Sequence, residues 1–382
     1  MNPLFTPIKL GSLILNDRIV MAPMTRSKSP GHVPGKDVAE YYGRRAAGLV
    51  GLIITEGTAV GHKAAHGYPD VPNIWGKEAL EGWSRVVQAV HQAGGKIFPQ
   101  LWHVGSVRQT HQCSNDGVDN PQAVCTCETK VPGYAPSAVR HPYLNEGEVP
   151  HVMSLQDIVD VIEAFAQAAS DARAIGFDGV EIHGAHGYLI DQFFWDRTNQ
   201  RTDLYGGKTL AERTRFAVDI VKAIRAKVGP NFPIGFRFSQ WKLGDYSAKM
   251  AHTPQELEAF LSPLVEAGVD LFHCSTRRYW EPEFEGSSLN LAGWTKKLTG
   301  KPTITVGSVG LDEDFIHSFS GNVAQSSQEH WDYLIQGLQN DDFSLVAIGR
   351  ALLGDPNWVK KIQEEKFGEI KPFSPEALSV LY

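Results

Sequence analysis

Residues 154–188 read SLQDIVDVIEAFAQAASDARAIGFDGVEIHGAHGY, and this stretch contains one complete helix-to-strand unit. Its first part, residues 154–175, has apolar side chains at helical spacing, and Ser154 with Asp157 three residues later forms a capping-box pattern at its start. A glycine ends the helix, and the apolar run at 178–183 predicts a buried strand. Polar residues of the types found in catalytic sites follow that strand directly.

The same alternation continues along the chain. Short segments rich in Val, Ile and Phe alternate with longer amphipathic stretches, and no Gly/Ser-rich linker divides them. Their near-continuous apolar character is typical of parallel strands, which are buried on both faces. The predicted strands are 18–23, 50–56, 96–101, 178–183, 233–238, 269–275, 302–306 and 343–348. The predicted helices are 37–47, 77–93, 154–175, 209–227, 253–267 and 328–339.

Eight strands alternating with helices predict an α/β fold, a (β/α)8 TIM barrel in which residues 1–382 form a single domain. The alternative is an open, doubly wound sheet. The turn at 22–24 lacks the glycine-rich phosphate fingerprint that follows the first strand of that fold. Before the first barrel strand, residues 8–15 with turn residues Asn16 and Asp17 predict a small hairpin that closes the bottom of the barrel.

Two segments have the composition of long loops. Residues 103–153 follow the third barrel strand and are rich in Pro, Gly, Asn and His, and a connection of this length is typical of a functional lid. Residues 317–328 are polar and predict an exposed loop. Three of the four cysteines lie in the lid, and the spacing of Cys113, Cys125 and Cys127 matches a metal site only weakly, so we expect no bound metal.

The composition excludes several classes of protein. The 382 residues are 42% hydrophobic and 21% charged, as in ordinary soluble globular proteins. No apolar run reaches the roughly eighteen residues that a membrane helix needs, and no secretory signal is visible, so we expect a cytoplasmic protein. A net charge of −7 without a Lys/Arg cluster argues against nucleic acid or a membrane as partner. We expect a small-molecule substrate, with a monomer and a homo-oligomer both left open.

The loops after the seventh and eighth strands contain a candidate phosphate site. In a TIM barrel the active site lies at the carboxyl ends of the strands, and these two loops often bind phosphate. They begin with Gly307 and Gly349, which let backbone N–H groups approach an anion, and Arg350 adds a cation suited to phosphate. The alternative is that both glycines only end their strands and Arg350 is a surface charge.

His183, His186 and Tyr188 follow the fourth strand, and three interpretations are open for them. They could bind a metal, although two histidines without an obvious third ligand make an incomplete zinc site. The histidines could be structural. We favour the third interpretation, in which imidazole N–H groups hold a carbonyl or nitro oxygen and Tyr188 donates a proton.

Arg237 ends an apolar strand, where a charge is costly unless it faces an anion or an electron-rich group. A cofactor that becomes anionic on reduction would satisfy it. Trp102, Tyr279 and Trp280 are candidate walls of an apolar substrate pocket. For Tyr279 and Trp280, an ordinary role in the core or on the surface is nearly as well supported.

Four strings of the chain resemble the old yellow enzyme family, which consists of FMN-dependent ene-reductases. The resemblance covers nearly the whole chain, with the motifs in order and at the expected separations, so together they are far more specific than any one of them. The strings are NDRIVMAPMTR at 16–26, QLWH at 100–103, HGAHGYL at 183–189 and NQRTDLYGG at 199–207.

The resemblance implies a barrel that binds FMN non-covalently, with NADPH or NADH as the reductant. It also implies a flavin site at the strand ends, with Pro23, Met24 and Thr25 along the flavin edge, Gly57 against the ring system, Gln100 at the pyrimidine edge and Arg237 at the N1/O2 side. The residues implied for its phosphate are Val306, Gly307, Ser308, Gly349 and Arg350, which agrees with the argument from the barrel loops.

The resemblance further implies two hydride transfers through one site. The nicotinamide would reduce FMN and leave, and an activated alkene (an enone, enal or nitroalkene) or a nitro compound would then bind, with its oxygen held by His183 and His186. Tyr188 would protonate the α carbon while hydride adds at the β carbon. The lid and the unusual segment 275–282 would shape the pocket mouth and leave the substrate undetermined. Two other hypotheses are a barrel that binds FMN or another ligand without turnover and a metal-dependent hydrolase that uses the histidine pair.

Overall fold

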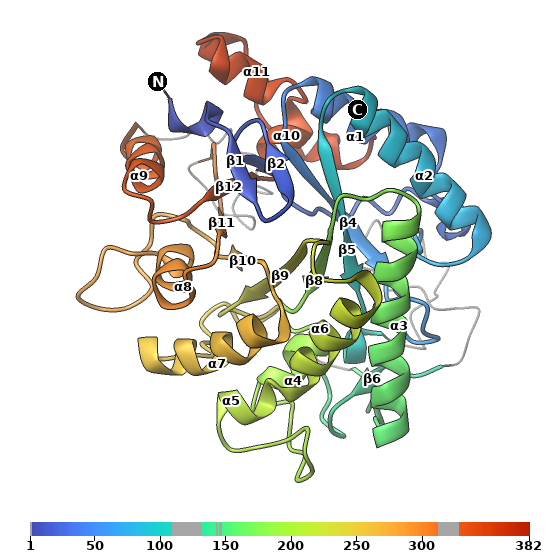
Figure 1. The fold of residues 1–382 in the computed structure, drawn as a ribbon. Coiled ribbons are helices and arrows are strands. Elements are labelled where there is room, and N and C mark those ends of the chain that lie inside the picture. Colours follow the sequence, from blue (N-terminus) through green and yellow to red (C-terminus); the bar gives the residue numbers. More distant parts are fainter. Residues whose placement is uncertain (1, 109–130, 143, 145–146, 312–327) are drawn as a thin grey trace.

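The strands occupy the middle of the molecule, and the helices surround them (Figure 1). In this computed structural model, which describes residues 2–108, 131–142, 144, 147–311 and 328–382, the eight strands form a closed parallel barrel in the order β10-β11-β12-β3-β4-β5-β8-β9. Each one overlaps a strand predicted from the sequence, so the predicted TIM barrel is confirmed. The barrel strands are β3 (Ile19–Met21), β4 (Leu52–Ala59), β5 (Lys96–Trp102), β8 (Val180–His183), β9 (Ile234–Ser239), β10 (Leu271–Ser275), β11 (Thr303–Val306) and β12 (Leu345–Ile348).

An antiparallel hairpin closes the amino-terminal end of the barrel. Strand β1 (Ile8–Leu10) pairs with β2 (Leu13–Leu15), and their leucines pack in one cluster with the first residues of β4, β10 and β12. The predicted hairpin is therefore confirmed, but its predicted turn at Asn16 and Asp17 is wrong. The turn lies at Gly11, which adopts a φ of +61° that glycine tolerates best, and the predicted turn residues instead lead into β3.

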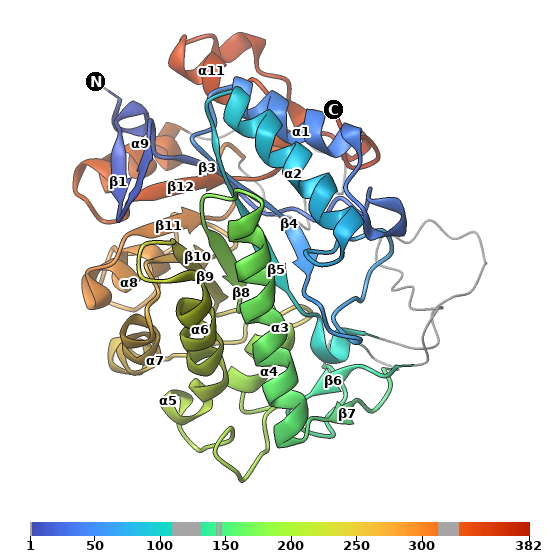
Figure 2. The same ribbon diagram turned by 45° about the vertical axis from the view of Figure 1, so that its right-hand side comes forward.

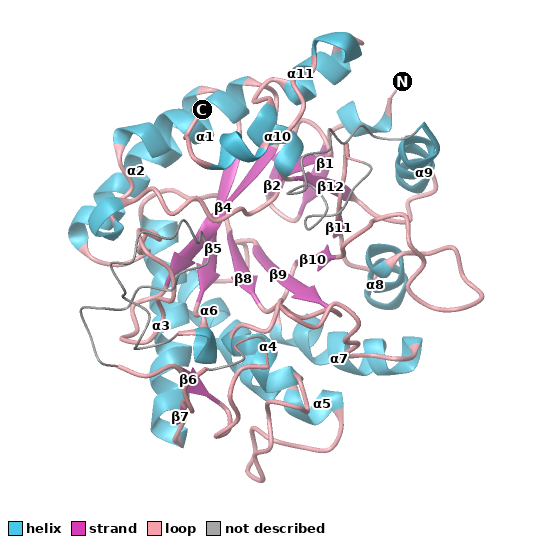
Figure 3. Ribbon diagram, turned by 180° about the vertical axis from the view of Figure 1, so that it is seen from behind, coloured by secondary structure: helices cyan, strands magenta, loops and turns pink. Residues whose placement is uncertain are grey.

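The helices cover the outer face of the barrel, as Figures 2 and 3 show from two sides. All predicted helices are present, with the one at 209–227 divided into α5 and α6, whereas α4, α8, α10 and α11 were not predicted. Most of the missed helices are too short to show a helical period. The helices are α1 (Lys36–Ala47), α2 (Lys77–Gln92), α3 (Leu155–Ala174), α4 (Leu189–Phe194), α5 (Leu210–Arg213), α6 (Arg215–Val228), α7 (Pro254–Ala267), α8 (Leu291–Thr299), α9 (Gln328–Gln339), α10 (Arg350–Gly354) and α11 (Trp358–Gln363). Short 3-10 turns occur at Pro3–Phe5, Pro30–His32, Gly105–Val107, Phe367–Glu369 and Pro375–Leu378.

The segment between β5 and α3 corresponds to the predicted lid. Its described parts include β6 (Tyr134–Ala135) and β7 (His151–Val152), which pair in parallel next to the start of α3 (Figure 2). The three lid cysteines and most of the loop predicted at 317–328 lie outside the described residues. Among the helices of the described residues, none is long and apolar enough to span a membrane. The cytoplasmic location stays a prediction.

Candidate active site

The predicted site residues gather at the carboxyl ends of the barrel strands, at the end opposite the hairpin. Because parallel strands all end at the same mouth of the barrel, residues distant in sequence meet there. The residues in question are Pro23, Met24 and Thr25 after β3, Gly57 in β4, Gln100 and Trp102 in β5, His183, His186 and Tyr188 at and after the end of β8, Arg237 in β9, Val306, Gly307 and Ser308 at and after the end of β11, and Gly349 and Arg350 after β12.

The loop after β8 carries the catalytic candidates in an unusual backbone conformation. His186 adopts a φ of +64° and Gly187 one of +79°, and this left-handed conformation is unfavourable for a histidine. Two side-chain oxygens accept hydrogen bonds from the backbone of this loop. The Ser239 hydroxyl accepts one from the His186 backbone N–H over 3.0 Å, and the Asp191 carboxylate accepts one from the Gly187 N–H over 2.7 Å.

The two imidazoles pack edge-to-face, with ring centroids 5.1 Å apart. His183 Nδ1 accepts a long hydrogen bond of 3.4 Å from the Ala185 backbone N–H, and His186 Nε2 lies 2.8 Å from the Ser275 hydroxyl. The other ring nitrogens, His183 Nε2 and His186 Nδ1, have no partner in the described part of the chain, and neither is enclosed by protein atoms. They are therefore available to a bound molecule.

Both imidazoles are neutral at pH 7. Burial lowers the pKa of His183 and of His186 well below the ordinary value, and the positive charge of Arg237 lowers both further. A neutral imidazole has one N–H donor and one acceptor nitrogen, so each ring can donate only from the nitrogen that carries its proton.

Aromatic side chains form a wall beside the histidines. Tyr68 stacks on Trp102 with ring centroids 5.3 Å apart, and Tyr188 packs edge-on against the same indole at 4.9 Å. The hydroxyls of Tyr68 and Tyr188 lie 2.9 Å apart. A Cβ on Gly57 would lie 2.3 Å from the indole, so Trp102 by itself requires a glycine there. Tyr68 was not predicted, because no local pattern marks it.

Tyr279 and Trp280 pack against helix α9. The Tyr279 hydroxyl donates a hydrogen bond to the His330 backbone carbonyl, and the Trp280 indole stacks on the His330 ring with centroids 3.6 Å apart. Tyr279 is 1% exposed and belongs to the main hydrophobic core. These contacts fit the packing role that the sequence left open, and the pocket role stays a prediction.

Arg237 is a buried cation, and no carboxylate lies within ion-pairing distance of it in the described residues. Its Nη2 donates a hydrogen bond to the Ser275 hydroxyl over 3.4 Å, and its buried Nε has no partner. Burial lowers the pKa of its guanidinium to about 10, so the charge persists at pH 7. Because such a charge is costly to bury alone, the position suits an electron-rich group of a bound molecule.

Gln100 belongs to a buried polar chain across the barrel. Its Nε2 donates a hydrogen bond of 2.8 Å to the Glu181 carboxylate, whose other oxygen lies 2.7 Å from His273 Nδ1. The carboxylate fixes the orientation of the amide, since only the nitrogen of Gln100 can donate to it. Glu181 and His273 were not predicted, because the contact joins residues from separate strands.

The loops after β11 and β12 lie together. Arg350 Nη2 donates a hydrogen bond of 3.3 Å to the Ser308 hydroxyl. Gly307 adopts a φ of +142°, and a Cβ there would lie 2.6 Å from a backbone oxygen of the loop after β10. A Cβ on Gly349 would lie 3.4 Å from the Met24 sulfur, so this pair of loops also adjoins the loop after β3. The predicted phosphate residues therefore form one group.

A family model described as the NADH:flavin oxidoreductase / NADH oxidase family matches residues 3–368. The chain belongs to this family. It is 36% identical over 328 residues to 12-oxophytodienoate reductase 2 of Arabidopsis thaliana, an alignment that covers 81% of this chain and 83% of that protein. The family membership inferred from the sequence motifs is confirmed, and the protein is an oxidoreductase.

Solved structures agree with this assignment. Morphinone reductase in complex with tetrahydroNAD aligns with a TM-score of 0.75 at 29% identity, over 98% of this chain and 93% of that chain. The old yellow enzyme homologue of Zymomonas mobilis aligns with a TM-score of 0.74 at 27% identity, over 99% of both chains.

A buried ion pair supports the loop after β8, which carries the catalytic candidates of this oxidoreductase. Lys242 Nζ lies 2.6 Å from Asp191 Oδ1, and both side chains are fully buried. Asp191 binds the Gly187 N–H through its other oxygen, and Lys242 also donates to the Ser239 carbonyl over 3.3 Å. Burial raises the pKa of Asp191, and Lys242 opposes that shift. Sequence reasoning missed this pair.

His141 connects the segment before α3 to the same loop. Its Nε2 donates a hydrogen bond of 2.8 Å to the Gly187 carbonyl, and the side chain is almost completely buried. Burial lowers the pKa of His141 from 6.5 to about 4, because the buried ring is not easily charged.

This pKa predicts a pH dependence of stability. As the pH falls below 6.5, the unfolded chain binds a proton at His141 before the folded protein does, so the free energy of unfolding falls between pH 6.5 and about 4. His141→Gln keeps a side-chain N–H but cannot bind this proton. Between pH 7.5 and 4.5 we therefore expect the free energy of unfolding of the variant to fall by about 2 kcal/mol less than that of the parent protein. Urea unfolding at both pH values measures this, and an equal loss in both proteins would contradict it.

The described residues contain no group of three or more His, Cys, Asp or Glu side chains arranged to hold a metal ion. The metal-site interpretation of His183 and His186 therefore gains no support from the described residues.

The motif at 199–207 has a structural role outside the barrel mouth. Asn199 Nδ2 donates hydrogen bonds of 2.8 Å to the backbone carbonyls of Phe193 and Tyr205, which ties the loop to the end of α4.

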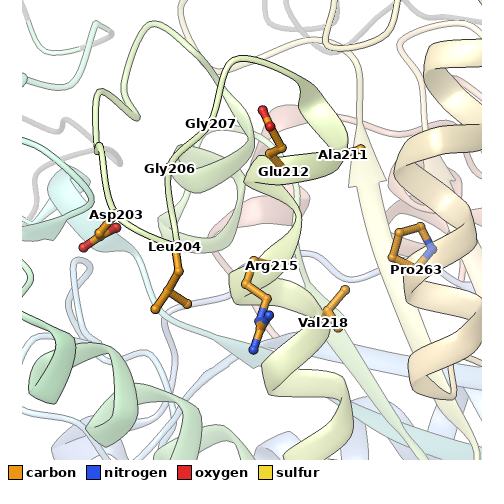
Figure 4. Close-up of a pocket in the computed structure, with 9 residues that line it drawn as sticks. All are labelled: Asp203, Leu204, Gly206, Gly207, Ala211, Glu212, Arg215, Val218 and Pro263. Atoms are coloured by element: carbon orange, nitrogen blue, oxygen red, sulfur yellow. The ribbon is translucent and has the colours of Figure 1, made fainter.

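Part of the motif lines an open pocket of about 440 Å³ near α5, α6 and α7 (Figure 4). The lining residues are Asp203, Leu204, Gly206, Gly207, Ala211, Glu212, Arg215, Val218 and Pro263. The charged groups in it are already engaged, such as Glu212 in the capping box of α5.

Proposed function

We propose that this oxidoreductase binds FMN non-covalently, is reduced by NADPH or NADH, and reduces activated C=C bonds of enones, enals or nitroalkenes, or nitro compounds. One observation carries the proposal. Two unpartnered imidazole nitrogens, on His183 and His186, lie at the barrel mouth beside Tyr188, whose ring centroid is 5.2 Å from that of His183. Hydrogen-bond donors converging on one space suit an oxygen on which negative charge develops.

The residues at the strand ends fit FMN. Arg237 offers a buried cation with an unpartnered Nε for the pyrimidine side of the flavin, and the Gln100 amide, oriented by Glu181, offers a second polar group. Arg350 and Ser308 offer a guanidinium and a hydroxyl for the phosphate. When bound, FMN would supply the redox chemistry, because a flavin takes hydride from a nicotinamide and gives it to an acceptor.

The side chains of the protein then have separate tasks. His183 and His186 bind the carbonyl or nitro oxygen of the substrate and stabilise the negative charge that develops on it. Tyr188 supplies the proton that the α carbon needs once hydride has been added at the β carbon. Trp102 and Tyr68 pack beside Tyr188 and limit the positions of its ring.

The relatives support this choice of substrate and reductant. The two reductases among them are named for oxo compounds, 12-oxophytodienoate and morphinone. The morphinone reductase structure holds tetrahydroNAD, which supports a nicotinamide as the reductant here as well.

The first test is the colour and reactivity of the purified protein. We expect a yellow protein whose flavin absorption bleaches anaerobically with NADPH or NADH and returns when an enone or nitroalkene is added. A colourless protein that cannot be reconstituted with FMN would refute the proposal. Flavin that is bound but never turned over would favour the non-catalytic barrel, and bound zinc in place of flavin would favour the hydrolase.

We expect Arg350→Ala to weaken FMN binding. The loss of a charge-assisted hydrogen bond, worth about 1.5–3 kcal/mol, corresponds to a rise in Kd of roughly 10- to 100-fold. Fluorescence titration of the apoprotein with FMN measures this. Lys360→Ala, which removes an exposed cation from α11, is the matched control and should leave Kd unchanged. An unchanged Kd for Arg350→Ala would contradict the phosphate assignment.

A further inference from the structure

Ser275, at the end of β10, lies between the His186 imidazole and the Arg237 guanidinium. Its Oγ is 2.8 Å from His186 Nε2 and 3.4 Å from Arg237 Nη2, and the residue is 2% exposed. Trp241 stacks on the face of the His186 ring, with ring centroids 4.3 Å apart. Its indole N–H donates a hydrogen bond to the Ser275 carbonyl over 3.2 Å. Trp241 thus restrains the plane of the imidazole, and Ser275 contacts its Nε2 edge.

The protons of these groups decide the direction of the bond between Ser275 and His186. A guanidinium can only donate, so Ser275 Oγ accepts from Arg237. The hydroxyl also has one proton of its own, and His186 Nε2 is the one acceptor that the hydroxyl has in the described part of the chain. A buried hydroxyl proton without an acceptor is costly. Ser275 therefore donates to Nε2, and the neutral imidazole carries its proton on Nδ1.

We propose that Ser275 is a positioning residue that holds His186 in the Nδ1–H tautomer, so that Nδ1 donates a hydrogen bond to the oxygen of the substrate. Nδ1 is the ring nitrogen of His186 that is unpartnered and accessible. The consequence for catalysis rests on the proposed function, whereas the tautomer itself does not.

His183 is the opposite tautomer, with its proton on Nε2, and a different contact determines this. Its Nδ1 accepts from the Ala185 backbone N–H, so its proton lies on Nε2, which is also unpartnered and accessible. With Ser275 in place, both accessible nitrogens are donors. Without the Ser275 hydroxyl, His186 can take its proton on Nε2 and turn the Nδ1 lone pair toward the substrate oxygen, which would repel it.

The direct test is ¹⁵N NMR of histidine-labelled protein, because the shift of a ring nitrogen shows whether it carries a proton. The His186 signals are identified by their loss in His186→Asn. We expect a protonated Nδ1 and an unprotonated Nε2 in the parent protein and in Ser275→Thr, and a shift toward a protonated Nε2 in Ser275→Ala. Ser239→Ala is the matched control, because its hydroxyl contacts the His186 backbone and not the ring, and it should keep the parent tautomer.

A kinetic measurement then tests the effect of the tautomer on substrate binding. We expect Ser275→Ala to bind cyclohexenone about tenfold more weakly in the reduced enzyme, which corresponds to about 1.4 kcal/mol, and Ser275→Thr to restore the affinity. A parent protein with its His186 proton on Nε2, or a Ser275→Ala spectrum identical to the parent spectrum, overturns the proposal. If Ser275→Ala does not fold, the tautomer of the parent protein decides alone. The expected tautomers in a protein that reduces no enone would support the role of Ser275 and refute the proposed function.

Discussion

Tyr188→Phe should slow reoxidation of the reduced flavin by an enone about 10²- to 10⁴-fold, the usual contribution of a positioned general acid. The reason is that the α carbon must gain a proton, and the Tyr188 hydroxyl is held beside His183 by Trp102 and Tyr68. Reduction of the flavin by NAD(P)H transfers hydride without this proton, so its rate should change little. Anaerobic stopped-flow absorbance separates the two half-reactions.

Tyr68→Phe is the matched control for this prediction. It removes the hydroxyl that lies 2.9 Å from that of Tyr188 and keeps the ring that stacks on Trp102. We expect a much smaller effect on reoxidation than in Tyr188→Phe. If Tyr188→Phe slows both half-reactions equally, Tyr188 is not the proton donor.

Lys242→Met should lower the free energy of unfolding by about 3–5 kcal/mol, because it leaves the fully buried Asp191 carboxylate without its cation. The loss should also reach the catalytic loop, since Asp191 holds the Gly187 N–H next to His186. We therefore expect weaker enone binding together with the lower stability. Urea unfolding of the apoprotein measures the first effect, and the dependence of the stopped-flow reoxidation rate on enone concentration measures the second.

Two variants test whether the unpaired charge is the cause. Lys242→Met combined with Asp191→Asn removes both charges but keeps an acceptor for the Gly187 N–H, and it should recover most of the stability because no buried charge is left unpaired. Lys36→Met breaks an exposed pair with Glu40, in which the lysine side chain is 89% exposed, and should change stability by about 0–1 kcal/mol. A double variant as unstable as Lys242→Met would show that packing, and not the charge, is responsible.

Several features of the fold were predictable from the sequence because they depend on local patterns. Apolar runs such as 178–183 are confirmed as barrel strands, since parallel strands buried on both faces require apolar side chains throughout. The capping box at Ser154 and Asp157 is confirmed as well, with both reciprocal contacts present. The predicted position of the turn in the first hairpin was wrong. An Asn-Asp pair and Gly11 are both acceptable turn residues, and only the strand pairing decides between them.

The hydrophobic pattern and the chain direction were enough to place His183, Arg237 and Arg350 at one mouth, because every strand of a parallel barrel ends on the same side. The pairing of side chains across that mouth came from the tertiary structure alone. Ser275 contacts the His186 ring and Lys242 contacts Asp191 at less than 3 Å, although the two residues of each pair are more than fifty positions apart in the sequence. A hydrogen bond depends on two atoms at bonding distance, and no local spacing in the sequence records which strands bring those atoms together.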